Sequence, residues 1–272
     1  MPRERFRDRT VLITGASSGI GAALARRFAA EGADLVLTAR RVEKLHDVAA
    51  ALPAPHAGIR VIRCDVTRDG DIEAAVEQVE REGGKLDVVV ANAGFGVAGN
   101  LEDLDLDDYR RQFETNVFGV LRTIYATLAQ LKRTRGCLVI IGSVAGHVPQ
   151  ARASAYGMSK FAIRALAEAA STELAGSGVA VTLITPGFVD SDIRRTGNRG
   201  VVHPSARDPV PAWLRMPADS AARKIVTAVH KRKRERIVTG HGRVLVLVYR
   251  YCPWLIRLAQ RSGAEGRREP GR

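Results

Sequence analysis

The chain reads Thr14-Gly15-Ala16-Ser17-Ser18-Gly19-Ile20-Gly21 directly after an apolar run at residues 11–13, and a helical pattern of apolar residues begins inside this stretch. A strand, a glycine-rich turn and a helix form the first part of a nucleotide-binding βαβ unit. Gly15 permits the sharp turn, Gly19 leaves room for a pyrophosphate, and Gly21 lets the helix pack close to the sheet. The helix N-terminus then presents free N–H groups and the positive end of its dipole to the phosphates.

Further apolar runs of strand length alternate with helical patterns along the chain. The predicted strands cover residues 34–38, 59–64, 86–90, 137–141, 179–184 and 237–238, and the predicted helices include residues 42–52, 69–81, 107–131 and 220–230. This alternation favours an α/β fold with right-handed crossovers. We therefore predict a single doubly wound Rossmann domain over residues 1–240, with a mainly parallel sheet flanked by helices and an irregular substrate lid at about residues 188–217.

The composition suits a large core without metal or disulfides. The 272 residues are 46% hydrophobic but only 5% aromatic, as expected for Val, Leu, Ile and Ala around buried parallel strands. Cys64, Cys137 and Cys252 lie far apart and lack the spacing of a metal site, so we expect reduced cysteines and no metal. The charged N-terminus lacks the apolar segment of a secretory signal, so we expect a cytoplasmic location.

The net charge of +13 is concentrated near the C-terminus. Residues 220–272 contain 14 Lys and Arg against 3 Asp and Glu, whereas the first 219 residues contain 28 against 26. A uniformly basic chain would favour nucleic-acid binding. The asymmetry instead indicates a nearly neutral domain followed by a basic extension at residues 241–272, which faces an anionic partner or solvent. We expect no nucleic-acid partner.

The end of the second predicted strand bears on the choice of cofactor. An NAD-binding enzyme usually places Asp or Glu there to bind the ribose 2′-hydroxyl. This chain has Ala39, followed at once by Arg40 and Arg41. A guanidinium can bind a 2′-phosphate through two hydrogen bonds, whereas a carboxylate would repel it. Arg40 therefore favours NADP(H) over NAD(H); the alternative is that both arginines only begin a solvated helix.

Short polar residues follow three more strands. Asp65-Val66 can reach an adenine, although a turn or helix-start role fits the spacing equally well. Asn92-Ala93-Gly94 forms a turn of small residues that would lie beside the cofactor. Because ligands bind at the carboxyl edge of such a sheet, Ser143, which follows the 137–141 strand, is also predicted to lie at the site.

Tyr156 and Lys160 are four residues apart in the next helical pattern, so they share one helix face. Tyrosine has a pKa of about 10, and a nearby cation favours the phenolate and lowers that pKa. Tyr156 can give a proton to a carbonyl oxygen while Ser143 hydrogen-bonds the same oxygen. Asn116 lies mid-helix beside an apolar stripe, where its amide needs partners, so we expect a kink or a polar relay.

These motifs and Pro186-Gly187 occur in the order and spacing of the short-chain dehydrogenase/reductase family, which the chain resembles from about residue 10 to residue 217. The resemblance implies an oxidoreductase that interconverts a carbonyl and an alcohol. The implied catalytic residues are Asn116, Ser143, Tyr156 and Lys160. It further implies that Lys160 binds the nicotinamide ribose and that Asn116 holds a water linking Lys160 to solvent.

The resemblance also implies cofactor contacts. The Pro186-Gly187 turn and the Val189 backbone would contact the nicotinamide end, and Ser191 stands where the family usually has Thr. The expected cofactor-binding residues are Gly15, Ser17, Ser18, Gly19, Ile20, Gly21, Arg40, Asp65, Val66, Asn92, Ala93, Gly94, Tyr156, Lys160, Pro186, Gly187, Val189 and Ser191.

The irregular pattern at residues 192–217 is typical of a lid or a disordered segment. Trp213 and Met216 are candidates for an apolar substrate wall there. The expected substrate-binding residues are Ser143, His147, Tyr156, Trp213 and Met216, although a loop histidine is more commonly at the surface. Arg194, Arg195 and Arg199 could contact an anionic group, and solvated arginines are the favoured alternative.

Residues 244–256 are apolar but are interrupted by Arg250 and Pro253, which leaves too short a stretch to span a bilayer. Its Trp and Tyr with flanking arginines would suit a membrane interface. Packing as an oligomer or lid element is slightly favoured. The last residues, 261–272, are rich in Gly and Arg and are predicted to be disordered.

We expect an NADP(H)-dependent oxidoreductase that acts on a small hydrophobic substrate, such as a lipid, a steroid or an acyl-type ketone, and its secondary alcohol. A sugar or polyol dehydrogenase of the same family is one alternative, and a non-catalytic dinucleotide-binding regulatory protein is another. The resemblance implies a homodimer or homotetramer through the helices of Asn116 and Tyr156. The basic extension adds the option of peripheral membrane contact.

Overall fold

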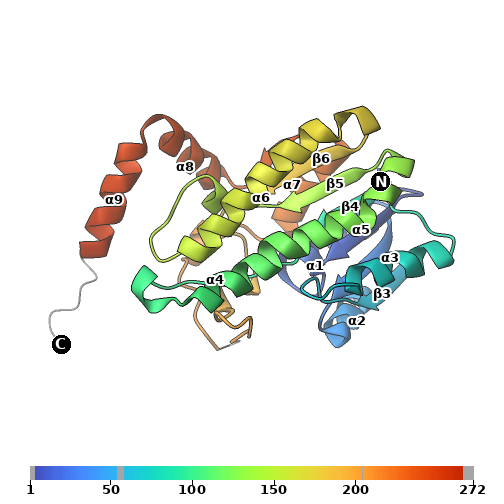
Figure 1. Cartoon of the computed structure of the whole chain (residues 1–272), viewed down its shortest axis with the longest axis horizontal. Helices are drawn as coiled ribbons and strands as arrows, with labels where there is room; N and C mark the ends of the chain where they lie inside the picture. The colour runs from blue at the N-terminus through green and yellow to red at the C-terminus, as the bar shows by residue number, and fades with distance from the viewer. Residues whose placement is uncertain (1–3, 54–57, 204, 266–272) are drawn as a thin grey trace.

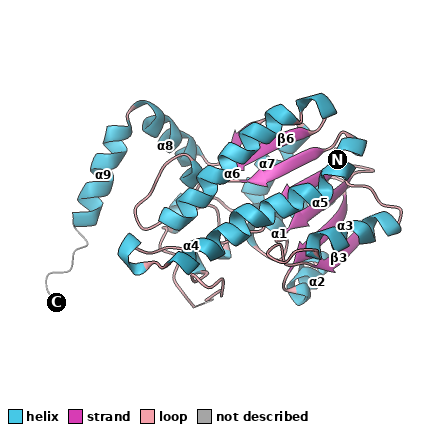
Figure 2. Cartoon of the chain, in the orientation of Figure 1, coloured by secondary structure: helices cyan, strands magenta, loops and turns pink. Residues whose placement is uncertain are grey.

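Seven parallel strands form one sheet in the computed structural model, which describes residues 4–53, 58–203 and 205–265 (Figures 1 and 2). The strand order is β3-β2-β1-β4-β5-β6-β7. The strands are β1 (Thr10–Thr14), β2 (Asp34–Ala39), β3 (Ile59–Arg63), β4 (Val88–Ala91), β5 (Cys137–Ile141), β6 (Ala180–Thr185) and β7 (Glu235–Ile237). This doubly wound arrangement confirms the predicted fold class.

Helices cover both faces of the sheet. One face carries α1 (Gly19–Ala29), α2 (Val42–Ala50) and α7 (Ala218–His230), and the other carries α3 (Asp71–Arg81), α5 (Gly119–Thr134) and α6 (Ser154–Glu173). The two faces have separate buried clusters, because alternate side chains of each strand point to opposite sides. Strands such as β1 and β5 are buried along their whole length, because helices cover both faces of the sheet.

The strand order reverses between β1 and β4, which are neighbours in the sheet although β2 and β3 lie between them in the chain. Loops that follow these two strands leave in opposite directions and open a crevice at the carboxyl edge. The turn at residues 15–18 and the segment 92–94 both lie at this crevice. The topology therefore gathers the sequence motifs at one edge of the sheet.

The predicted helix over residues 107–131 is interrupted. The structure has α4 (Leu106–Phe113), a π-helical turn at Glu114–Phe118 and then α5. Asn116 lies in this turn, which confirms the expected break in regular geometry. The helix begins one residue earlier than predicted, where Asp105 and Asp108 form a capping box.

The C-terminal region leaves the body as two helices, α8 (Gly240–Tyr251) and α9 (Pro253–Glu265), joined at Cys252 (Figure 1). Within the described ranges, no helix has the length and hydropathy needed to cross a membrane. The predicted disordered end starts inside α9, which continues to Glu265, and residues 266–272 lie outside the described part. Cys64 and Cys137 are buried free thiols and Cys252 is a half-buried one.

Candidate active site

The glycine-rich turn packs directly against the end of β4. A Cβ atom on Gly21 would lie 2.4 Å from the carbonyl oxygen of Gly15 and 2.7 Å from Nδ2 of Asn92, so only glycine fits there. Ser18 precedes α1 without a side-chain cap, which leaves the first N–H groups of the helix available to a phosphate. A cavity of about 440 Å³ opens beside Ser18 and Gly19, and lid residues 190–192 form its other wall.

Asn92 and Thr14 join the two strand ends on either side of the crevice. The Asn92 amide donates to the carbonyl oxygens of Thr14 (2.9 Å) and Gly15 (3.1 Å), and the Thr14 hydroxyl accepts from the N–H groups of Asn92 and Ala93. The Asn92 amide therefore holds the turn to β4. Its predicted contact with the cofactor remains a prediction, as do those of Ala93 and Gly94.

Asp65 and Val66 follow β3 with different partners. The Asp65 carboxylate accepts hydrogen bonds from the N–H group and the hydroxyl of Thr67, as in a local turn. The Val66 side chain is buried against Gly119 of α5. These contacts give both residues a structural role, and an adenine contact is still to be tested.

The two arginines after β2 lie differently. Arg40 is exposed, with its guanidinium beside Gly200 of the lid. Arg41 instead reaches the glycine-rich turn, where its guanidinium nitrogen lies 3.3 Å from Ser17 Oγ and 3.5 Å from Ser18 Oγ. The sequence predicts a role for Arg40, whereas Arg41 is the cation that contacts Ser17 and Ser18 of the glycine-rich turn.

Ser143 and Tyr156 meet at the carboxyl edge of β5. Ser143 begins a 3-10 turn at Val144–Gly146, and Tyr156 lies in the first turns of α6. The Ser143 side chain lies close enough to Tyr156 to favour its phenolate. A carbonyl oxygen placed at these two hydroxyls would meet one hydrogen-bond donor and one proton donor.

Burial and neighbouring side chains act in opposite directions on the pKa of Tyr156. Burial raises the pKa of Tyr156, and the Ser143 hydrogen bond and the charge of Arg194 oppose the shift. The Lys160 ammonium lies 5.8 Å from the centre of the Tyr156 ring and donates a hydrogen bond to the Ile141 carbonyl at 2.9 Å. Burial lowers the pKa of Lys160 itself to about 8.

Asn116 is a positioning residue in this structure. Its amide nitrogen donates to the carbonyl of Phe95 (3.0 Å) and to Ser159 Oγ (3.2 Å), and its amide oxygen accepts from the Phe95 N–H at 3.1 Å. Ser159 lies next to Lys160 in α6. The π-helical turn therefore connects the loop after β4 to the helix that carries Tyr156 and Lys160.

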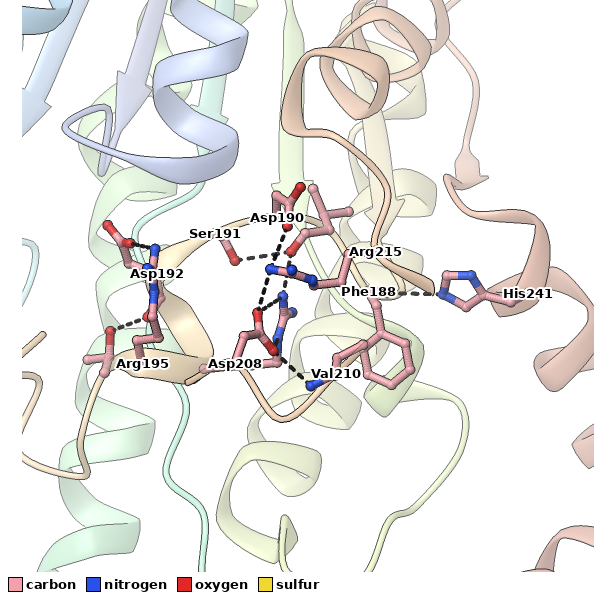
Figure 3. Close-up of polar contacts among 12 residues, drawn as sticks. Phe188, Asp190, Ser191, Asp192, Arg195, Asp208, Val210, Arg215 and His241 are labelled. Carbon is pink, nitrogen blue, oxygen red and sulfur yellow. Dashed lines mark hydrogen bonds and ion pairs between the residues drawn. The ribbon is translucent and has the colours of Figure 1, made fainter. Parts of the chain in front are cut away.

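The segment after β6 closes over the cofactor crevice. Ser191 lies against Gly19, where a Cβ atom on the glycine would be 3.1 Å from Ser191 Cβ. Val189 pairs with Met216, and the backbone of Phe188 is held by His241 of α8, whose Nε2 accepts the Phe188 N–H at 3.1 Å (Figure 3). A Cβ atom on Gly187 would lie 2.6 Å from that same Nε2. Residues of α8 thus support the Pro186-Gly187 turn.

An ion cluster that the sequence reasoning missed holds the lid. Arg194 donates two hydrogen bonds to Asp208 (2.8 and 2.7 Å), and Arg215 bridges Asp190 and Asp208 (Figure 3). Arg194 lowers the pKa of Asp208 to about 2. The sequence favours an Arg194 that faces solvent. This expectation is wrong, because the Arg194 side chain is mostly buried. Opposite charges within one irregular loop were the only sequence signal.

Three predicted substrate contacts have other neighbours. His147 is nearly buried, with Nε2 2.9 Å from the Glu235 carboxylate of β7. Trp213 and Met216 line a separate pocket whose walls, among the described residues, include none of the four catalytic candidates. Trp213 is also 83% exposed. A substrate contact of these three residues therefore remains a prediction.

The residues present fit a dinucleotide. The uncapped start of α1, the close glycine contacts and the cavity beside Ser18 suit a pyrophosphate. Ser143, Tyr156 and Lys160 lie farther along the same edge, where the reacting end would meet a substrate. Among the described residues, Lys160 donates a hydrogen bond to the neutral Ile141 carbonyl and has no acidic partner, which suits donation to ribose hydroxyls.

Comparisons with known proteins agree with this geometry. The family model for short chain dehydrogenases matches residues 9–201. An 11-beta-hydroxysteroid dehydrogenase A from Sesamum indicum is 34% identical over 267 residues, which cover 94% of this chain and 76% of the relative. An uncharacterized oxidoreductase from Staphylococcus epidermidis is 34% identical over 188 residues, 69% of this chain and 80% of the relative.

Two solved structures extend the likeness over nearly the whole chain. A short-chain dehydrogenase from Sphingobium yanoikuyae, in complex with NADPH, aligns with a TM-score of 0.72 and 28% identity over 97% of this chain and 98% of that one. One from Streptomyces avermitilis aligns with a TM-score of 0.77 and 29% identity over 95% and 99%. With its doubly wound sheet and its Ser143–Tyr156 pair, this chain belongs to the short-chain dehydrogenase/reductase family and is an oxidoreductase acting on CH–OH and C=O groups.

Proposed function

We propose that this protein is an NADP(H)-dependent oxidoreductase that interconverts a hydrophobic ketone and its secondary alcohol. The observation that carries the reaction is the pairing of Ser143 with Tyr156 at the carboxyl edge of β5, with Lys160 one helical turn from Tyr156. The bound dinucleotide supplies or accepts the hydride. The chain's own residues orient the carbonyl and move the proton.

In the reduction direction, the Ser143 hydroxyl donates a hydrogen bond to the carbonyl oxygen and Tyr156 gives that oxygen its proton. Arg194 and Ser143 already favour the phenolate that this proton transfer leaves. Lys160, positively charged near neutral pH despite its lowered pKa, holds ribose hydroxyls. Asn116 holds α6 and the loop after β4 in fixed positions relative to each other for this transfer.

The preference for NADP(H) rests on charge at the adenosine end. Ala39 replaces the usual acidic residue at the end of β2, and Arg41 lies against Ser17 and Ser18 while Arg40 is free to turn toward a 2′-phosphate. The NADPH complex of the Sphingobium neighbour and the 5-hydroxy-NADP complex of an alcohol dehydrogenase from Thermococcus sibiricus support the same choice.

A hydrophobic substrate is favoured by the surroundings of the loop after Ser143. Gln260 of α9 donates to the Pro149 carbonyl at 2.8 Å, which brings α9, with its exposed apolar side chains, to this loop. The 11-beta-hydroxysteroid dehydrogenase A relatives act, by name, on a steroid. Both observations favour a steroid-like or lipid-like ketone over a sugar.

The test combines cofactor binding with turnover. NADPH and NADH are titrated against wild type, Arg41→Asp, Arg40→Asp and the control Arg81→Asp, which changes an exposed arginine on α3. We expect both tested variants to weaken NADPH binding by roughly tenfold or more while sparing NADH, because each replaces a bidentate cation by a repelling carboxylate. Equal binding of both cofactors to wild type would contradict the NADP(H) assignment. A panel of apolar ketones and sugars, assayed in parallel, distinguishes the substrate classes.

We also propose a homo-oligomer formed through α5, α6 and the π-helical turn. Phe118, Tyr125, Met158 and Phe161 are exposed apolar residues on these elements. Light scattering after gel filtration measures the mass. We expect a dimer or tetramer for wild type and a monomer for Tyr125→Glu/Phe161→Glu, and a monomeric wild type would contradict this proposal.

A further inference from the structure

A second cavity, of about 720 Å³, lies between α7, the lid segment at residues 213–217 and the start of α8. We refer to it as the basic pocket. Its cationic lining residues are Arg215, Arg223, Lys224, Lys231, Lys233 and Arg236, with His241 beside them. Of the described residues that line it, none is acidic. The neutral lining includes Trp213, Leu214 and Met216, which form an apolar wall.

Most of these cations have no counter-ion among the residues that the structure describes. Arg215 pairs with Asp190 and Asp208, but Lys231, Lys233 and Arg236 make no side-chain hydrogen bond or ion pair within residues 4–53, 58–203 and 205–265. Lys224 donates only to the neutral Val238 carbonyl and Met216 sulfur. Burial first, and then the charges of Arg236 and Arg243, lower the pKa of Lys224. Like charges held together at a concave surface attract anions.

The basic pocket also touches the segment that closes over the cofactor crevice. The Met216 N–H donates to the Phe188 carbonyl at 2.9 Å, and the Asp190 N–H donates to the Met216 carbonyl at 2.9 Å. His241 accepts the Phe188 N–H and its ring stacks on the Phe188 ring (Figure 3). A ligand in the basic pocket would therefore contact Met216 and His241, which hydrogen-bond to the backbone of residues 188–190.

We propose that the basic pocket binds a phosphate-bearing ligand with at least two negative charges. Lys231, Lys233, Lys224 and Arg236 supply the charge-assisted donors, and the Trp213 wall receives an apolar or planar part of the ligand. The ligand is a soluble phosphorylated molecule or the headgroup of an anionic lipid, which the neighbouring apolar helices α8 and α9 would accompany. This site is independent of the carbonyl chemistry at Tyr156.

Tryptophan fluorescence reports on this pocket. The chain has two tryptophans, and Trp254→Phe leaves Trp213 as the only one. This variant, saturated with NADP⁺ to occupy the dinucleotide crevice, is titrated with inorganic pyrophosphate. A second arm uses vesicles of phosphatidylcholine with and without phosphatidic acid. We expect a saturable change in Trp213 emission in at least one arm. Tighter binding to vesicles that contain phosphatidic acid than to pyrophosphate would identify the ligand as a lipid headgroup.

Charge-matched double variants make the test specific. Lys231→Gln/Lys233→Gln removes two pocket cations, and Lys85→Gln/Lys132→Gln removes two exposed lysines elsewhere. We expect binding to weaken roughly tenfold in the first and by less than about twofold in the second. Equal weakening in both would show a diffuse charge effect and overturn the proposal. The absence of any saturable Trp213 signal in both arms would also overturn it.

Discussion

The catalytic edge of the sheet and the C-terminal region are built in opposite ways. At the catalytic edge, Asn116 is fully hydrogen-bonded and Lys160 is buried with its ammonium on the Ile141 carbonyl. In the C-terminal region, which here includes the segment between α7 and α8, Lys231 and Lys233 are exposed and make no side-chain pair within the described residues. The helices that follow them expose Leu247, Tyr251 and Trp254.

The catalytic edge therefore holds its polar groups in place before any ligand binds, whereas the C-terminal surface is stabilised by binding a partner. Buried polar groups are held in one geometry because leaving them without hydrogen bonds costs free energy. Exposed cations and apolar side chains carry no such constraint, and their stabilisation comes from a bound ligand, lipid or second chain. Mutations should therefore be costly at the catalytic edge and nearly silent in the isolated C-terminal helices.

The largest difference is expected for Tyr156→Phe, which removes the proton donor. We expect kcat for ketone reduction to fall by about 10²–10⁴-fold, with NADPH affinity nearly unchanged, because the ring and its packing remain. Steady-state assays of NADPH oxidation and a fluorescence titration measure the two quantities. Tyr125→Phe, on the exposed face of α5, is the control and should keep full activity. Retained turnover in Tyr156→Phe would exclude this residue as the acid.

A second contrast uses pH and the buried cation. Burial lowers the pKa of Lys160 from 10.5 to about 8, so between these two values the unfolded chain binds more protons at this residue than the folded one. Stability therefore rises with pH across this window, by up to about 3 kcal/mol. Urea unfolding at several pH values, without cofactor, should show wild type gaining stability relative to Lys160→Met as the pH rises from 8 to 10. If the free energies of unfolding of wild type and Lys160→Met changed in parallel with pH, the result would contradict a buried charge at Lys160.

A pair of glycines compares the packing of the two regions. Gly21→Ala should destabilise the protein by about 1–3 kcal/mol and weaken NADPH binding, because its Cβ atom would overlap the Gly15 carbonyl oxygen. Gly240→Ala, at the first residue of α8, meets no atom within 4 Å and should be neutral or slightly stabilising. Thermal and urea unfolding of both variants measure the difference. Similar losses would mean that α8 is as tightly packed as the crevice.

The smallest effect is expected for a chain that ends at Tyr251. It lacks α9, whose Gln260 donates a hydrogen bond to the Pro149 carbonyl, but it keeps His241 against Phe188. We expect the free energy of unfolding to change by less than about 0.5 kcal/mol. A chain that ends at Thr239 serves as the comparison, since it also loses His241 and should bind NADPH more weakly. A large loss on removing α9 alone would show that this helix belongs to the core.

The sequence predicted the parts that follow from periodicity and turn chemistry. Apolar runs such as β1 and β5 and the glycines around Gly19 fixed the fold and the edge at which Ser143 and Tyr156 meet. The relative roles of Arg40 and Arg41 could not be predicted, because adjacent side chains leave a turn in different directions. The same holds for the Arg194–Asp208 pair, which joins residues 14 positions apart in an irregular loop. The pKa of Lys160 depends on burial that no spacing rule reports.

The most direct test of the account follows the hydride and the proton together. NADPH carrying deuterium at C4 is mixed with the most reactive apolar ketone of the panel. The mixture is incubated with wild type in one reaction and with Tyr156→Phe in another, and the alcohol formed in each is analysed by mass spectrometry. We expect one deuterium at the carbinol carbon with wild type and at most a trace of product with Tyr156→Phe. Deuterated alcohol formed equally well by both proteins would contradict the assignment of Tyr156, and NADPH binding without any deuterated product would favour a non-catalytic dinucleotide-binding protein.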